Sequence, residues 1–286
     1  MNEIPSSKAI ELKNNTCVYC GIVLTQDTST KEHVIARHFV PKGKLQGSWN
    51  LIVKACKHCN GKKCDLEDDI SAITMQPDAY GRYGHDDAVA ASEGERKGQG
   101  SRSRYTGKVV KNSLENMTVE MPLGKVGTIS VDFVAPPQVR QERLFCLARF
   151  QLMGFFYWIT FDESSRCGGF WTGGFWTVQA VRRSDWGNQV QRAFMDAVVQ
   201  WEPRVLGCTA DEFYKVAMKR HPDADCWSWA LEWNKSFRLV GFFGNHQAAK
   251  DVVSRFPRLE FHKVVQGWSF RRETPLDESK DRLFIN

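Results

Sequence analysis

Two short motifs near the start of the chain decide the first part of the fold: Cys17-Val-Tyr-Cys20 and Cys56-Lys-His-Cys59. Two matched C-x-x-C pairs supply four thiolates, which is the ligand set of a closed, tetrahedral structural zinc site. Tyr19 and Gly21 suit the tight turn that aims the first two sulfurs at one ion. The alternatives are four unrelated buried cysteines or a redox pair. The matched spacing favours one zinc ion bound by Cys17, Cys20, Cys56 and Cys59.

The composition is that of a folded protein. Hydrophobic residues make up 42% of the 286 residues and charged residues 25%, which argues against wholesale disorder. The net charge of +6 is compatible with a polyanionic partner, although many soluble enzymes are equally basic. Nine cysteines, an odd number in a chain of this length, do not indicate a secreted disulfide framework.

No targeting or membrane segment is expected. The stretch Met1–Asn15 lacks the apolar region of a signal peptide. The most apolar stretch, Phe150–Phe161, is too short to span a bilayer. We therefore expect a cytoplasmic protein with reduced thiols and no membrane partner.

The residues between and after the cysteine pairs indicate the function. Thr30-Lys-Glu-His33 comes first, Trp49-Asn50-Leu51-Ile52 follows, and Asn60 stands directly after the second pair. The order is a cysteine pair, an acid–histidine pair, a central asparagine, a second cysteine pair and an asparagine at a helix start. This order resembles the HNH endonuclease family, in its branch that carries a zinc ribbon.

The resemblance implies a ββα-metal fold for residues 1–75 and hydrolysis of phosphodiester bonds in DNA by a divalent-metal-dependent endonuclease. His33 would be the general base, because an imidazole can accept a proton from water near neutral pH. Asn50 would fix the loop and orient His33. Glu32 and Asn60 would bind the catalytic ion, and such oxygen ligands suit Mg²⁺, or Mn²⁺ in its place. Outside this constellation, Glu32-His33 would be interpreted as an ordinary surface pair.

Basic residues near this unit are candidates for DNA binding. Lys62 and Lys63, expected at the helix surface, are candidates for phosphate contacts, although surface lysines are often only solvated. Gly94–Lys111 contains six basic residues and one acid, a local charge of six minus one, or +5. Arg102 and Arg104 in this tract are candidates for DNA contacts. The alternative is a solvated linker without a partner.

The chain beyond the first unit is predicted as α+β, with residues 76–107 as a Gly/Ser-rich linker or mobile loop and 108–286 as a larger mixed domain. Its many tryptophans favour a packed core, although aromatic side chains can also stack on bases. Within it, strands are expected in 108–134, Trp227–Phe243 and Val264–Arg272, strand or turn in Gly168–Val181, and helices in Gln138–Ile159 and Asn188–Trp201.

The sequence leaves several functions open. The leading interpretation is a DNA endonuclease, restriction-like or in phage defence, whose C-terminal domain supplies specificity or activation. That domain would recognise DNA, a protein partner or a small-molecule activator. One alternative is the nuclease subunit of a larger complex. Another is a non-catalytic zinc-dependent DNA-binding module, which would have no need of Glu32, His33, Asn50 and Asn60. The oligomeric state stays open.

Overall fold

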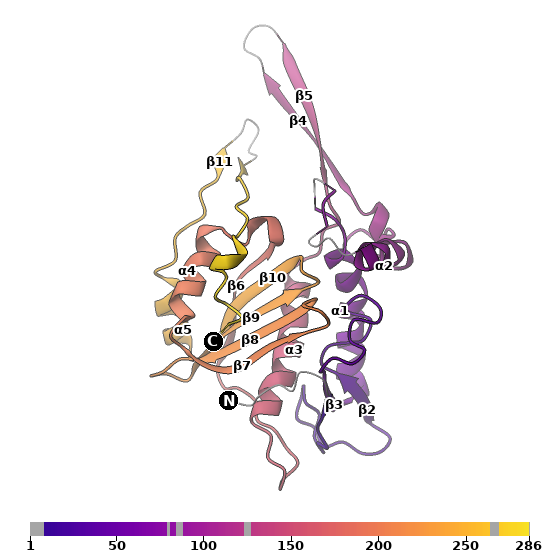
Figure 1. Cartoon of the computed structure of the whole chain (residues 1–286), viewed down its shortest axis with the longest axis vertical. Coiled ribbons are helices and arrows are strands. Elements are labelled where there is room, and N and C mark those ends of the chain that lie inside the picture. The colour runs from indigo at the N-terminus through magenta and orange to yellow at the C-terminus, as the bar shows by residue number, and fades with distance from the viewer. Residues whose placement is uncertain (1–8, 79–80, 84–87, 123–126, 264–268, 286) are drawn as a thin grey trace.

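The computed structural model describes residues 9–78, 81–83, 88–122, 127–263 and 269–285. The fold is mixed α+β, as the sequence predicted. Figure 1 shows a central antiparallel sheet with helices on both of its faces and the smaller N-terminal strands and helix α1 beyond one of them.

The N-terminal unit is a small sheet and one long helix. Strands β2 (Ser29–His33) and β3 (Leu51–Cys56) pair antiparallel, and the short β1 (Ile10–Glu11) pairs parallel with the other edge of β3. Helix α1 (Lys57–Thr74) begins directly after β3, with Cys56 as its N-cap. Because the helix starts at the second cysteine pair, that pair is held at the junction between a strand and a helix.

The segment predicted as a linker contains helix α2 (Ala88–Gly100), so the prediction of a loop there is wrong. Glycines reduce the helix propensity of this stretch, but two of them allow close packing. A Cβ atom at Gly94 would lie 2.7 Å from the carbonyl oxygen of Met75, and one at Gly98 would lie 2.9 Å from the amide of Gln76. The helix therefore depends on packing against the end of α1.

A two-stranded hairpin follows, made of β4 (Glu115–Pro122) and β5 (Thr128–Ala135), after a single 3₁₀ turn at Val110–Asn112. It projects away from the rest of the molecule (Figure 1). Helix α3 (Gln141–Ile159) comes next, starting shortly after Pro136 and Pro137 and confirming the predicted apolar helix. A polar residue within it, Gln151, is buried and accepts hydrogen bonds from Tyr214 and Trp233.

The larger sheet is antiparallel and contains the strands in the order β6-β10-β9-β8-β7. Helix α3 packs on one face, while α4 and α5 cover the other (Figure 1). Several tryptophans are buried in this half, as predicted: Trp186, Trp201, Trp227, Trp229 and Trp233. The elements are β6 (Gly174–Arg182), α4 (Gln189–Val198), β7 (Glu202–Thr209), β8 (Tyr214–Arg220), β9 (Cys226–Trp233), β10 (Phe237–Gly244) and α5 (His246–Val253).

The C-terminal segment has little regular structure among its described residues. Strands β11 (His262–Lys263) and β12 (Ser269–Phe270) form a short hairpin, and a 3₁₀ turn covers Glu278–Lys280. Part of the predicted strand Val264–Arg272 lies at residues 264–268, outside the described residues. No helix in the described part of the chain has the length and apolar character needed to cross a bilayer.

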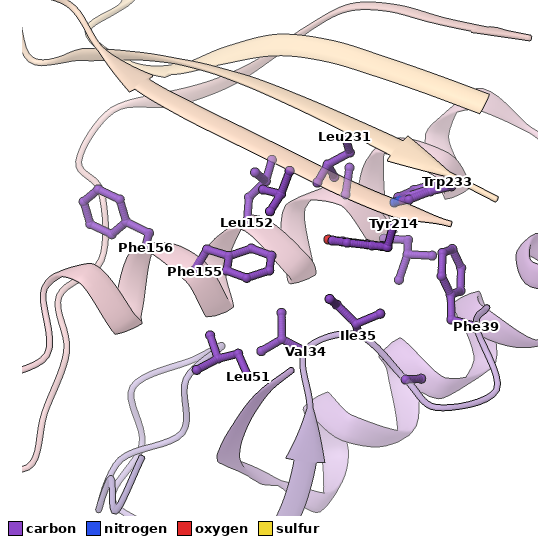
Figure 2. Packing of buried hydrophobic residues seen from close by; sticks show 14 of the residues in the cluster. Val34, Ile35, Phe39, Leu51, Leu152, Phe155, Phe156, Tyr214, Leu231 and Trp233 are labelled. Atoms are coloured by element: carbon purple, nitrogen blue, oxygen red, sulfur yellow. The ribbon is translucent and has the colours of Figure 1, made fainter. Parts of the chain in front are cut away.

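One hydrophobic core joins the N-terminal unit to the larger sheet. Val34 and Leu51 from the N-terminal unit pack with Phe155 of α3, and Tyr214 and Trp233 of the sheet lie on the other side of the same cluster (Figure 2). All five side chains are buried. Helix α3 therefore packs between the N-terminal unit and the larger sheet and contacts both.

Candidate metal centre and active site

The two cysteine pairs meet in space. The ligand atoms of Cys17, Cys20, Cys56 and Cys59 all lie within 4.8 Å of one another, and the sulfurs of Cys20 and Cys56 are 3.8 Å apart. Tetrahedral zinc with Zn–S bonds of about 2.3 Å requires sulfurs about 3.8 Å apart. The four side chains can thus bind one structural metal ion such as zinc.

The backbone around the sulfurs favours thiolates. The amide of Cys56 donates to the sulfur of Cys17 at 3.3 Å, and the amide of Cys59 donates to the sulfur of Cys56 at 3.4 Å. Burial raises the pKa of the Cys17 and Cys59 thiols, so a bound cation is needed to keep these two deprotonated at neutral pH. Gly21, with φ of +75°, closes the first turn, because its backbone N–H donates a hydrogen bond to the Cys17 carbonyl.

A buried cluster of charged residues lies next to this centre. The ammonium group of Lys63 is 2.7 Å from Glu32 Oε1 and 2.6 Å from Glu67 Oε1, and it donates to the His33 carbonyl at 3.1 Å. Tyr19, between the first two cysteines, donates its hydroxyl to Glu32 Oε1 at 3.0 Å. The first cysteine pair and the acidic residue of β2 are therefore joined by a direct hydrogen bond.

The charges in this cluster do not balance. Burial raises the pKa of Glu67 to about 7, although Lys63 partly offsets this effect. Burial alone would lower the pKa of Lys63, but Glu67 and Glu32 outweigh it and leave that pKa raised. The cluster has one ammonium group for two carboxylates, so ionisation of both carboxylates would leave one buried negative charge. Such a charge is costly unless a cation lies nearby.

The prediction that Lys63 lies at the helix surface as a candidate for DNA contacts is wrong. Its side chain is fully buried, because two carboxylates and a carbonyl surround its ammonium group. Lys62, the neighbouring candidate, is exposed on α1 and stays a prediction. A signal was present in the sequence, since Lys63 and Glu67 are four residues apart on one helix and can form an ion pair.

His33 is the last residue of β2, so the chain bends away immediately after it. Its Nε2 atom is buried and has no hydrogen-bond partner among the described residues. Burial, aided by the positive charge of Arg37, lowers the pKa of His33 below its usual value. The imidazole is therefore largely neutral at pH 7, with an unpaired ring nitrogen.

The two predicted asparagines make different contacts. Asn50 Nδ2 donates to the Ile35 carbonyl at 2.7 Å, and the Ile35 amide donates back to Asn50 Oδ1 at 3.4 Å. This pair of bonds fixes the loop that leaves β2. Asn60, on the first turn of α1, donates from Nδ2 to Thr30 Oγ1 at 2.9 Å.

A second metal ion would need oxygen ligands from β2 and α1. Thr30 and Glu32 are two residues apart on one strand and share a face, so Asn60 lies on the same face as Glu32. Lys63 already engages Glu32 Oε1, which leaves the other carboxylate oxygen and Asn60 Oδ1 as donors. Two hard oxygen donors, beside a cluster with two carboxylates and one ammonium group, fit Mg²⁺ with water completing its coordination.

Part of this chain is similar to the Septu protein PtuB of Bacillus thuringiensis. The two sequences are 39% identical over 57 residues, which is 19% of this chain and 21% of that protein. The chain thus covers about a fifth of the relative's length. No family model matches this chain, and no solved structure matches it.

Most of the basic tract is already paired within the protein. Arg96 pairs with Glu93, Lys111 with Glu95, and Arg104 with Asp65 and Asp68 of α1. Lys97 is buried and donates to the His38 carbonyl, and burial lowers its pKa to about 8. Part of the local charge of +5 is therefore offset in space, since Glu93 and the acids of α1 pair with Arg96 and Arg104 from outside the tract.

Arg102 remains a candidate for a phosphate contact, since its side chain is exposed and its guanidinium donates to the Gly107 carbonyl at 3.3 Å rather than to a carboxylate. We expect Arg102→Ala to reduce the slope of log affinity against log salt by about one unit. Arg104→Ala should change this slope less, because its guanidinium already pairs with Asp65 and Asp68. Fluorescence anisotropy on labelled duplex DNA at several salt concentrations measures both. An unchanged slope for Arg102→Ala would show that Arg102 makes no phosphate contact.

Proposed function

We propose that this chain is a divalent-metal-dependent DNA endonuclease of the HNH type, with a structural zinc ion at the four cysteines. One observation carries the proposal. Glu32, His33 and Asn60 occupy the end of β2 and the first turn of α1, while Asn50 holds the loop that follows His33. These are the residue types and relative positions that the family resemblance requires.

The contacts support a role for His33 as the base. Its neutral imidazole and unpaired Nε2 suit acceptance of a proton from the attacking water. Asn50 holds the backbone at Ile35 and so limits the positions that His33 can adopt. When bound between Glu32 and Asn60, a Mg²⁺ ion would stabilise the negative charge that develops on the scissile phosphate.

Lys63 acts as a positioning residue in this proposal. Its ammonium group holds Glu32 Oε1 and the His33 carbonyl at the same time. It therefore fixes a metal ligand and the backbone of the base relative to each other. Tyr19, which lies between Cys17 and Cys20, donates a second hydrogen bond to the same carboxylate oxygen. The fold of the zinc site therefore helps to fix the position of Glu32.

The biological setting is proposed as phage defence or restriction, with the partial similarity to a Septu protein as support. In this proposal residues 108–286 supply DNA recognition, activation or contact with a partner. The nuclease subunit of a larger complex is the main alternative, and a non-catalytic DNA-binding module is the other. The unpaired Nε2 of His33 favours catalysis, because a binding module would have no use for a buried, unpaired imidazole nitrogen.

The test is cleavage of supercoiled plasmid with Mg²⁺, with Mn²⁺ and with EDTA. We expect wild-type protein to cut only with a divalent ion, and Asn60→Ala to lose activity that returns in part at higher Mn²⁺ concentration, since the variant lacks one ligand. Asn116→Ala, at an exposed position of β4, is the matched control and should cut normally. Cleavage that persists in EDTA, or full activity of Asn60→Ala at low Mg²⁺, would contradict the assignment.

A further inference from the structure

A cavity of about 330 Å³ lies where the β4–β5 hairpin joins the rest of the molecule, remote in sequence from the proposed nuclease residues. Its walls come from the segment after β5, the first turn of α3, the ends of β6 and β10, and the C-terminal segment. Pro137, Val139, Leu144, Val181 and Phe237 make much of the lining apolar.

Arg182, at the end of β6, contributes a positive charge to this cavity. Its guanidinium lies over the ring of Phe237, with the carbon 4.7 Å from the ring centroid, and Nη2 donates to the Pro137 carbonyl at 3.1 Å. The side chain keeps some exposed surface, but Nη1 is buried and has no partner among the described residues. A guanidinium nitrogen in this position normally binds an oxygen atom.

Three acids of the described chain line the cavity and none forms an ion pair with Arg182: Asp185 and Asp78 are engaged by other arginines, and Glu273 lies beyond ion-pair distance. Asp185 is engaged by Arg271 Nη1 at 2.7 Å, and Asp78 by Arg82 Nε at 3.0 Å. No carboxylate of the described residues forms an ion pair with Arg182. Burial lowers the pKa of Arg182 to about 10, which Glu273 and Asp78 only partly offset, so the guanidinium stays protonated at neutral pH without a direct ion-pair partner among the described residues.

Two further groups near Arg182 favour an anion. Ser184 Oγ is buried, unpartnered among the described residues, and lines the same cavity. Gln141 begins α3, whose N-cap residue Arg140 makes no side-chain capping bond. The N-terminus of α3, the positive end of its dipole, therefore borders this cavity, and the Arg140 side chain does not cap its backbone N–H groups. A second cavity of about 240 Å³ shares Arg182 and Ser184.

We propose that this cavity is a binding site for a small organic anion, whose phosphate or carboxylate group contacts Arg182 and Ser184 and whose apolar body packs along Phe237 and Leu144. The anion supplies the counter-charge and oxygen acceptors that these groups lack. The volume of the two adjoining cavities suits a molecule about the size of a nucleoside monophosphate rather than a bare ion. This inference does not depend on the proposed nuclease function.

The test is thermal unfolding of the full chain with AMP, benzoate, inorganic phosphate and adenosine. At saturating concentration we expect AMP or benzoate to raise the Tm of the wild-type protein by about 2–4 °C, because a ligand that binds only the folded state stabilises it. Inorganic phosphate should give a smaller rise, and neutral adenosine none. Arg182→Met should lose the rise, and its Tm without ligand should equal or exceed that of wild type, since an uncompensated buried charge has been removed.

Arg192→Met, at an exposed position of α4, is the control and should keep the full ligand effect. Two results would overturn the proposal. One is no anion-dependent rise in wild type together with a lower Tm of ligand-free Arg182→Met, which would make Arg182 a structural residue. The other is an equal rise from adenosine and AMP, which would show that charge has no part in recognition. Ser184→Ala, a milder change, should weaken anion binding even if Arg182→Met does not fold.

Discussion

His33→Ala should abolish DNA cleavage while zinc content, folding and DNA binding stay nearly unchanged. The reason is that His33 contributes an unpaired imidazole nitrogen and makes no structural hydrogen bond through it. Removal of a general base typically lowers the rate by about 10²–10⁴-fold. Single-turnover cleavage of a plasmid that the wild-type protein cuts measures this loss, and anisotropy on the same DNA measures binding.

His58→Ala is the matched control, because this histidine is exposed on the first turn of α1. It should cut at the wild-type rate. Residual activity of Glu32→Ala and Asn60→Ala should rise with Mg²⁺ or Mn²⁺ concentration, whereas that of His33→Ala should not. If His33→Ala cuts as fast as wild type, His33 is not the base and the nuclease assignment of this site is wrong.

Cys56→Ser should release the structural zinc and unfold the N-terminal unit. Cys56 is one of the four cysteines that can bind a metal ion, and its sulfur caps α1 by accepting a hydrogen bond from the Cys59 amide. Structural zinc sites contribute about 10–16 kcal/mol of binding free energy that is also folding free energy. Elemental analysis after EDTA washing should give one zinc per wild-type chain and far less for the variant, with loss of helical signal in circular dichroism.

Cys64→Ser is the control for this experiment. The Cys64 side chain is exposed on α1, one helical turn beyond Asn60. It should keep both zinc and fold. A wild-type protein without zinc, or with a Cys17–Cys56 disulfide in reducing buffer, would contradict the metal site.

The sequence predicted the local framework of the candidate site well, because short-range spacing determines it. Two C-x-x-C pairs converge on one point. The family resemblance implied a strand at His33 and a helix at Asn60, and β2 does end at His33 while α1 contains Asn60. Apolar side chains nearly all round Gln138–Ile159 also predicted a buried helix, which is α3.

Other features depend on contacts between distant segments and were missed. Helix α2 forms in a stretch with poor helix propensity because its glycines fit against Met75 and Gln76. The basic tract was predicted from charge along the chain, but Asp65 and Asp68 of α1 approach it only in the folded protein. The fully buried position of Lys63 likewise follows from the convergence of Glu32 on one strand and Glu67 on a helix.

The shared position of α3 has a consequence for the engineering of this protein. A fragment that ends before α3 would expose Val34, Ile35 and Leu51 to water, and each such side chain contributes about 1.5–3 kcal/mol by its burial. We therefore expect the N-terminal unit to be insoluble or unfolded when expressed alone. Transplanting it onto a different second half would require a replacement for α3, so the two halves cannot be exchanged as independent modules.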